Sequence, residues 1–358
     1  MCRQAEGSRE PILFAKKERE KSRWRVGRGW QKSEYRNKTK PKNPKPNLVK
    51  ILFFTDSHED YVADSLLHGL KRLFGSEVVD YPKKDILYKG DLTKRHGLWG
   101  KGFTLYTGLL ENDEADRYDI GQKLRDDYYD LTLISSIHRQ DHFFRKYHSH
   151  LHKRNTLIID GEDGTIPVWG IDRSLSMLKE YRYYKREQTN VGRRLFSRPV
   201  PLRPISISYP EEKIHIPSMK TKIFCSHIVD PEVAAHLKGN VEHVFLTERD
   251  YYNDLQASYF GVTMKRGGWD CMRHYEMAGN GVLLCFRNLD RKPVGCAPHG
   301  LSEANAVIYD NADDLMEKTQ ELKAECRELL QVESSRWIRN NTTLKSAERI
   351  FGDYLKDR

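Results

Sequence analysis

LVKILFFTDSHEDYVADSLLHGLKRLFGSEVVDY, residues 48–81, decides the fold class of this chain. Residues 48–54 form a short apolar run, which is typical of a strand buried on both faces. Residues 61–74 place apolar side chains at helical spacing, and Gly75 is a stop signal for that helix. Residues 77–81 predict a second strand. The stretch is therefore a strand-helix-strand unit of an α/β fold.

The same pattern continues along the chain on both sides of a proline-rich break. Five prolines between residues 196 and 217 disfavour a continuous helix or a central strand there. We predict further strands at 131–135, 156–160, 222–226, 241–246, 282–286 and 305–309, and helices at 231–237, 312–331 and 344–355. This order predicts two tandem Rossmann-like, doubly wound α/β domains with a C-terminal helix.

Four segments follow from this pattern. They are a disordered basic tail at 1–47, an N-terminal Rossmann-like domain at 48–198, a proline-rich crossover at 199–219 and a C-terminal Rossmann-like domain at 220–358. Doubly wound sheets bind ligands outside the carboxyl ends of their strands. We therefore expect a binding site in the cleft between the two domains.

The net charge of +10 is concentrated at the N-terminus. Residues 1–47 contain 15 Lys and Arg against 5 Asp and Glu, whereas the remainder holds 46 of each. A basic tail of this kind is either a tether to an anionic partner, such as a membrane or RNA, or a solvated extension. Basicity is thus not evidence that the body binds nucleic acid.

Cysteine spacing and hydropathy indicate a soluble cytoplasmic protein. The six cysteines include no C-x-x-C pair, which argues against a zinc ribbon, a thioredoxin-type site and a disulfide framework. No apolar run approaches the ~18 residues that a membrane-spanning helix needs. The apolar run at 11–15 is too short for the core of a signal peptide.

The stretch GGWDCMRHYEMAGNG, residues 267–281, precedes another apolar run at 282–286. It resembles the E-A-x-A-x-G-x-P-V-V element of GT-B glycosyltransferases, with Glu276 and Gly281 at the matching separation. More narrowly, it is similar to the CgeB-like, glycosyltransferase family 1-like branch. The resemblance implies that Glu276 sits at a helix start and binds the ribose of a nucleotide-sugar donor. It also implies that Gly281 lets the helix turn into the next strand.

The chemistry of the neighbouring residues fits such a donor. A carboxylate accepts hydrogen bonds from two adjacent ribose hydroxyls, and backbone amides at a helix start hold a diphosphate. Trp269 either stacks on a base or sugar or packs in the core. Retaining members of the family carry a second glutamate where this chain has Gly268, with Asp270 the nearest acid, so the stereochemistry stays open. The predicted donor-binding residues are Lys265, Arg266, Gly267, Gly268, Trp269, Asp270, Arg273, Glu276 and Gly281.

Candidate catalytic groups follow two strands of the first domain. Asp56 or His58, after the first strand, provides a general base, or else Asp56 and Ser57 cap the next helix. His138 and Arg139, after the strand at 131–135, offer a titratable imidazole beside a fixed cation. No D-x-D element is placed to bridge a metal and a diphosphate. We therefore expect a metal-independent enzyme without a cofactor.

These features predict a glycosyltransferase, hexosyl or related, that moves a sugar from a nucleotide-diphosphate sugar to a glycan, lipid or protein acceptor. An oxidoreductase is disfavoured because residues 55–61 contain no G-x-G-x-x-G. The alternative from another class is a non-catalytic, transferase-like adaptor that binds nucleic acid or an anionic membrane through its tail. The donor sugar, the nucleobase and the acceptor are left open.

Overall fold

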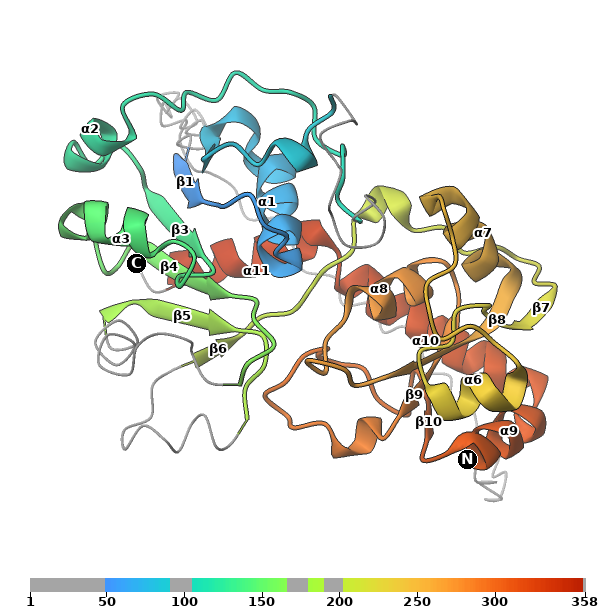
Figure 1. The fold of residues 1–358 in the computed structure, drawn as a ribbon. Helices are drawn as coiled ribbons and strands as arrows, with labels where there is room; N and C mark the ends of the chain where they lie inside the picture. Colours follow the sequence, from blue (N-terminus) through green and yellow to red (C-terminus); the bar gives the residue numbers. More distant parts are fainter. Residues whose placement is uncertain (1–48, 91–104, 166–179, 190–201, 357–358) are drawn as a thin grey trace, which may run out of the picture. The chain divides into compact units, whose positions relative to one another are not determined.

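Six short parallel strands form the first sheet, in the order β2-β1-β3-β4-β5-β6 (Figure 1). The computed structural model describes residues 49–90, 105–165, 180–189 and 202–356. Ile51 and Phe53 of β1 join one core cluster, while Leu52 and Phe54 join another, because successive side chains of a strand point to opposite faces. The strands are β1 Ile51–Phe54, β2 Val78–Tyr81, β3 Leu131–Ser135, β4 Thr156–Asp160, β5 Arg182–Lys185 and β6 Leu202–Pro204.

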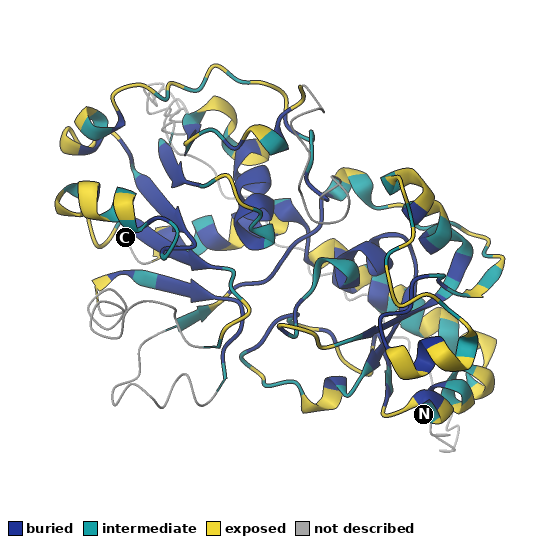
Figure 2. Ribbon diagram, viewed as in Figure 1, coloured by how far each residue is buried: buried dark blue, intermediate teal, exposed yellow. Residues whose placement is uncertain are grey.

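Four parallel strands form the second sheet, in the order β10-β9-β8-β7. Its strands are β7 Lys222–Phe224, β8 Ser258–Met264, β9 Leu283–Arg287 and β10 Val307–Tyr309. The inner strands of both sheets are buried, the edge strands β6 and β7 are partly exposed, and the helices around the sheets expose one side (Figure 2). The described sheets confirm the prediction of two doubly wound α/β domains.

Helices connect the strands of both sheets. Those following strands of the first sheet are α1 Tyr61–Phe74, α2 Ile120–Arg125 and α3 Asp141–Tyr147. Those in the second half are α6 Pro231–Leu237, α7 Glu248–Ala257, α8 Met272–Gly279, α9 Ala312–Glu321, α10 Ala324–Asn340 and α11 Thr343–Lys356. Short 3₁₀ turns lie at η1 Gly75–Glu77, η2 Asp85–Leu87, η4 His148–His150, η5 Glu211–Lys213 and η6 Leu289–Arg291.

Helix α1 has the predicted bounds, but its cap differs from the predicted one. The Asp60 carboxylate accepts a hydrogen bond from the Ala63 amide at 3.0 Å, which satisfies one of the free donors at the helix start. The Asp56 carboxylate instead accepts from the amide of His58 at 2.6 Å. Asp56 is thus not the helix cap.

The strand predicted at 241–246 is wrong. Within the described residues this segment forms no strand, and the side chains of Val241, Val244 and Leu246 are exposed. The central place in the sheet belongs instead to β8, which pairs with β7 on one side and β9 on the other. Residues 241–246, V-E-H-V-F-L, are rich in side chains that favour strands, but a strand forms only where such side chains are buried against neighbours.

Two other predicted segments differ from the structure. The helix expected at 312–331 is divided into α9 and α10, with a break at residues 322–323. Residues 202–204, expected within the crossover, form β6 and pair with β5 at the edge of the first sheet. Proline is compatible with this position because an edge strand leaves one row of amides unpaired.

The C-terminal helix α11 packs on α1 of the first sheet, although it follows the second sheet in sequence (Figure 1). Ala347 and Ile350 are buried in the same core cluster as Leu66 and Leu70 of α1. The His68 imidazole lies 2.9 Å from the Thr343 hydroxyl through Nδ1 and 3.1 Å from the Glu212 carboxylate through Nε2. The last helix of the chain, α11, therefore packs against a helix of the first sheet.

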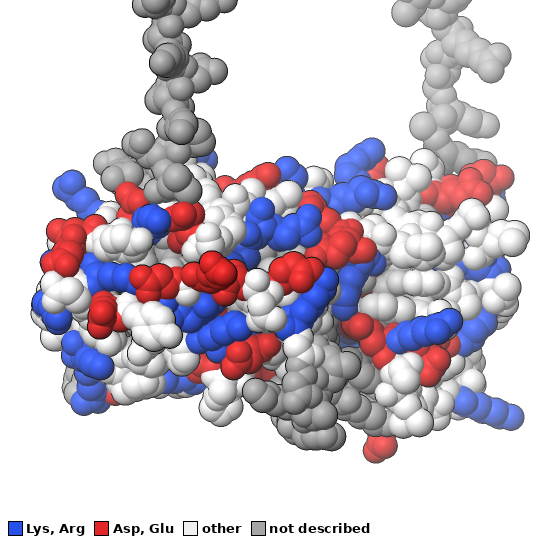
Figure 3. Space-filling model, turned by 90° about the horizontal axis from the view of Figure 1, so that it is seen from above, with Lys and Arg blue, Asp and Glu red and all other residues white. Residues whose placement is uncertain are grey.

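The basic tail predicted at 1–47 lies outside the described residues. On the face drawn in Figure 3, acidic and basic side chains are interspersed rather than gathered by sign. None of the helices that the structure describes is both long and apolar enough to span a membrane.

The close approach of α1 and α11 gives a test of this packing. A Cβ added at Gly69 would lie 2.0 Å from the Thr343 carbonyl oxygen, whereas one added at Gly352 of α11 meets nothing within 4 Å. We expect Gly69→Ala to cost about 1–3 kcal/mol through overpacking. Gly352→Ala should gain about 0.5–1 kcal/mol, because alanine is the better helix former. Urea unfolding measures both, and equal effects would contradict the close packing.

Candidate functional site

Helix α8 carries the residues for which the sequence predicted ribose and phosphate binding. It follows β8 after the turn at Gly267 and Gly268, and begins at Met272, so Glu276 lies one turn inside it rather than at its start. Gly281 adopts φ +73°, a left-handed conformation that glycine accepts without strain, and the chain then enters β9. The turn before α8 thus sits at the carboxyl end of a central strand, and the turn at Gly281 leads into the amino end of the next strand.

The Glu276 carboxyl group is 6% exposed and contacts two tyrosines. The hydroxyls of Tyr251 and Tyr252 donate to its two oxygens, each at 3.3 Å. Burial raises the pKa of Glu276 to about 7, Glu248 adds to this, and Lys213 and Arg273 oppose it. At neutral pH the Glu276 carboxyl group is therefore close to its pKa. Two hydroxyl donors in addition to Tyr251 and Tyr252 would favour its charged form.

Both tyrosines lie on α7, Glu248–Ala257, a segment for which the sequence analysis predicted no element. A start signal was present. The Thr247 hydroxyl accepts from the Asp250 amide at 3.1 Å and donates to its carboxylate at 2.7 Å. The Thr247 hydroxyl therefore caps the helix, and the letters T-x-x-D are a start signal that the sequence contains.

Arg273 lies on α8 one turn before Glu276. Its guanidinium is half-buried, and Nη1 has no hydrogen-bond partner among the described residues. No ion pair of 4.0 Å or less joins it to Glu276 in that part of the chain. Lys265 and Arg266 are exposed beside it, on the turn after β8. The first half of α8 and the turn before it therefore combine a buried carboxyl group with cations that form no ion pair within 4.0 Å among the described residues.

Trp269 and Asp270 are occupied by contacts within the protein. The Trp269 ring stacks on Phe286 of β9, with centroids 6.3 Å apart and planes at 27°. The Asp270 carboxylate accepts from the Ile207 amide and from the Tyr275 hydroxyl, each at 3.0 Å. Trp269 thus packs against the core here, and both oxygens of Asp270 have protein donors.

The catalytic candidates lie at the carboxyl edge of the first sheet. The exposed His58 imidazole places Nδ1 3.4 Å from Asp56 Oδ1, while Asp56 Oδ2 is buried without a partner among the described residues. His138 and Arg139 instead share the Glu162 carboxylate, at 3.4 Å and 3.0 Å. The structure thus brings the four candidates into two pairs, and the Asp56–His58 pair has the exposed imidazole.

The two halves of the candidate site are neighbours. Tyr61, the first residue of α1, has a phenol whose pKa is raised by burial and by the charges of Glu59, Cys271 and Glu276. The loop after β1 therefore lies close to the start of α8. No group of three His, Cys, Asp or Glu side chains able to hold a metal occurs in residues 49–90, 105–165, 180–189 and 202–356.

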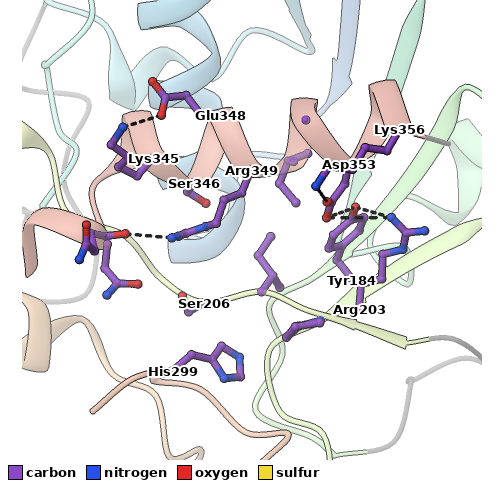
Figure 4. Close-up of a pocket in the computed structure, with 16 residues that line it drawn as sticks. Tyr184, Arg203, Ser206, His299, Lys345, Ser346, Glu348, Arg349, Asp353 and Lys356 are labelled. Atoms are coloured by element: carbon purple, nitrogen blue, oxygen red, sulfur yellow. Dashed lines mark hydrogen bonds and ion pairs between the residues drawn. The ribbon is translucent and has the colours of Figure 1, made fainter. Parts of the chain in front are cut away.

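A cavity of about 820 Å³ lies along α11, β5 and β6, and none of the predicted site residues lines it. Two of its basic side chains have partners (Figure 4). Lys345 forms an ion pair with Glu348 at 2.8 Å, and Arg349 donates a hydrogen bond to the Asn340 carbonyl at 2.8 Å. The predicted site residues lie elsewhere, around α8 and at the carboxyl edge of the first sheet.

Comparisons with solved structures identify the fold. A glycosyltransferase from Rickettsia africae superposes with a TM-score of 0.52 at 11% identity, over 87% of this chain and 99% of that one. HepE from Anabaena, solved in complex with UDP and glucose, superposes with a TM-score of 0.51 at 9% identity, over 86% and 100%. No protein-family model and no curated protein sequence matches the chain.

These two parallel sheets, with a C-terminal helix that returns to the first, make up the GT-B fold. The fold prediction is therefore confirmed. The CgeB-like branch stays a prediction, since no family model matches.

The raised pKa of Glu276 gives a test by pH. A carboxyl group with a raised folded-state pKa contributes stability that is complete below pH ~4.5 and is lost as pH rises through about 7. Glu276→Gln resembles the protonated form and should be more stable than wild type at pH 8 by on the order of 2 kcal/mol, and equal to it near pH 4. Urea unfolding across this range measures the difference.

Glu317→Gln, on the exposed side of α9, is the control and should leave the pH profile of stability unchanged. Parallel profiles for wild type and Glu276→Gln would contradict the buried, perturbed carboxyl group.

Proposed function

We propose that this protein is a glycosyltransferase that takes a sugar from a nucleoside-diphosphate sugar. The observation that carries the proposal is the start of α8, where the buried Glu276 carboxyl group and the unpaired Arg273 guanidinium lie one turn apart. A nucleoside diphosphate presents a diol and an anion, and needs an acceptor for one and a cation for the other. The GT-B fold and the UDP bound by HepE support this assignment.

Each group then has a chemical task. Glu276 accepts hydrogen bonds from the two ribose hydroxyls. Arg273, with Lys265 and Arg266, offsets the charge that develops on the departing diphosphate, an interaction that strengthens in the transition state. Binding of this kind positions the anomeric carbon, but it does not itself activate the acceptor.

Activation of the acceptor hydroxyl is assigned to the Asp56–His58 pair. His58 is exposed and lies at the carboxyl end of β1, while Asp56 orients it through Nδ1 at 3.4 Å. The imidazole Nε2 is then available to accept the acceptor proton. His138 and Arg139, bound to Glu162, are proposed to contact the acceptor rather than to act as the base. The acceptor class, whether glycan, lipid or protein, is not part of the proposal.

Nucleotide binding tests the proposal directly. In a thermal-shift panel of UDP, GDP, ADP, CDP and TDP, we expect one nucleotide to raise the melting temperature, since a ligand at 100 times its Kd stabilises by about 2.7 kcal/mol. Glu276→Ala should weaken that nucleotide by about tenfold to a hundredfold, the cost of hydrogen bonds to a charged group. Calorimetry measures the affinity, which should also rise with pH through the titration of Glu276.

Glu317→Ala, an exposed glutamate of α9, is the matched control and should bind as wild type does. If no nucleotide stabilises the protein, the proposed function is wrong. If one binds and Glu276→Ala binds it equally well, Glu276 is outside the site.

We further propose that transfer needs no divalent metal, because cationic side chains are available for the diphosphate. Donor hydrolysis should then be unchanged in excess EDTA, and adding Mn²⁺ should not accelerate it. Loss of turnover in EDTA with recovery on Mn²⁺ would contradict metal independence without affecting the assignment of Glu276.

A further inference from the structure

The cavity along α11 lies apart from the residues assigned to sugar transfer. Its volume is about 820 Å³, and its walls come from α11, β5 and β6, the following residues 205–206, His299 and the end of α10 (Figure 4). Ligand sites of proteins commonly enclose ~300–1,000 Å³. The space is therefore large enough for a small metabolite, and the charges of its walls determine which class of metabolite it fits.

Arg349 lines the cavity from α11. Its Nη1 donates to the Asn340 carbonyl at 2.8 Å, and the guanidinium forms no ion pair within 4.0 Å in the part of the chain that the structure describes. Although the residue as a whole is exposed, burial lowers the pKa of its guanidinium, against the opposing charges of Tyr275, Asp353 and Glu348. The nearby acids thus offset this positive charge only in part.

Ser346 places a hydroxyl beside this cation. Residues three apart on a helix share a face, and Ser346 precedes Arg349 by three on α11. Ser346 is 4% exposed and lines the cavity, and its hydroxyl has no hydrogen-bond partner within the described residues. Figure 4 shows both side chains on the side of α11 that faces Ser206 and His299. An acceptor bound in the cavity would give this hydroxyl its missing partner.

The wall opposite this pair, at His299, carries no negative charge. Burial lowers the pKa of His299 to about 4, and the charges of Lys292 and Arg349 lower it further. A hydrogen bond to the Ile205 backbone opposes them. The imidazole is therefore neutral at pH 7, and Arg349 faces an uncharged group across the cavity.

The two carboxylates of the lining have basic partners of their own. Glu348 pairs with Lys345 at 2.8 Å. Asp353 lies 4.0 Å from Arg203 on β6 and 4.0 Å from Lys356 on α11. Four basic residues thus stand against two acidic ones in the lining, and the lining has an excess of positive charge.

Asp353 gives the other end of the cavity a different character. Its Oδ2 accepts a hydrogen bond from the Tyr184 hydroxyl at 3.3 Å. A carboxylate has about four lone-pair sites, so Asp353 can accept further hydroxyl donors. Figure 4 shows Asp353 grouped with Tyr184 and Arg203, apart from Ser346 and the Arg349 guanidinium. The cavity therefore offers a cation at one end and a hydrogen-bond acceptor at the other.

We propose that this cavity is a second small-molecule site, which binds a phosphorylated sugar or polyol with its phosphate at Arg349 and Ser346 and its hydroxyls toward Asp353. A phosphate accepts charge-assisted hydrogen bonds from a guanidinium, and the hydroxyls of the same molecule donate to a carboxylate. The inference does not depend on the proposed function, because none of the residues assigned to the donor or to the acceptor lines this cavity.

Calorimetry with phosphorylated compounds tests the site. At least one of glucose-6-phosphate, ribose-5-phosphate and glycerol-3-phosphate should bind wild type more tightly than inorganic phosphate does. Arg349→Ala should weaken that ligand by about tenfold or more, the cost of losing hydrogen bonds to a charged group. Arg336→Ala is the matched control, since it removes an exposed arginine of α10 that pairs with Glu333 outside the cavity, and it should bind as wild type does.

Two further variants locate the ligand within the protein. Asp353→Asn should weaken the sugar or polyol phosphate but leave the affinity for inorganic phosphate unchanged, because only the hydroxyls reach Asp353. Arg273→Ala removes a cation at α8 and should leave the affinity for the ligand unchanged. Should Arg349→Ala not fold, Ser346→Ala serves in its place and must weaken the same ligand. Absence of binding by all three compounds, an equal loss in Arg336→Ala, or a loss in Arg273→Ala would overturn the inference, and none of these results decides whether a nucleotide binds.

Discussion

The buried carboxylate of Asp270 is the constraint on which the candidate site depends. Ile207 and Tyr275 donate to its oxygens, its amide donates to Glu187 at 2.9 Å, and its carbonyl accepts from Arg186. Burial raises the pKa of this group to about 6, against the opposing effects of Arg186 and of the two donors. Burying a carboxylate is costly unless its oxygens accept hydrogen bonds. The residues that make these bonds to Asp270 are therefore fixed relative to one another.

Those residues come from parts of the chain that are distant in sequence. The stretch after β5, the stretch after β6 and the start of α8 all meet at Asp270. Trp269, in the turn before α8, stacks on Phe286 of β9 and so attaches this turn to the second sheet. The positions of Arg186 and of the turn at Gly267 therefore depend on the hydrogen bonds that Asp270 makes, and not on the local backbone propensity of these segments.

Two side chains of the candidate site, Glu276 and Arg273, are buried in ways that cost stability. Glu276 is buried among tyrosines with a pKa near neutrality, which a structural residue at this position would avoid. Arg273 is partly buried with an unsatisfied nitrogen. Groups kept in such environments are typical of binding sites, because a ligand supplies the missing partners. On the first sheet the corresponding atom is Asp56 Oδ2, which is buried without a hydrogen-bond partner among the described residues.

The sequence by itself determined the two α/β sheets, the bounds of α1 and the polar turns after β1 and β3. In these segments the apolar runs and the helical spacing agree with the packing of the folded chain, so the local signals were sufficient. Only the tertiary structure decided that residues 241–246 form no strand, that β8 is central, that α11 packs on α1 and that Asp163 reaches Gly267. Each of these depends on contacts between residues far apart in the chain. Burial and charge pairing across such distances leave no periodic pattern in the sequence, and so they appear only once the chain has folded.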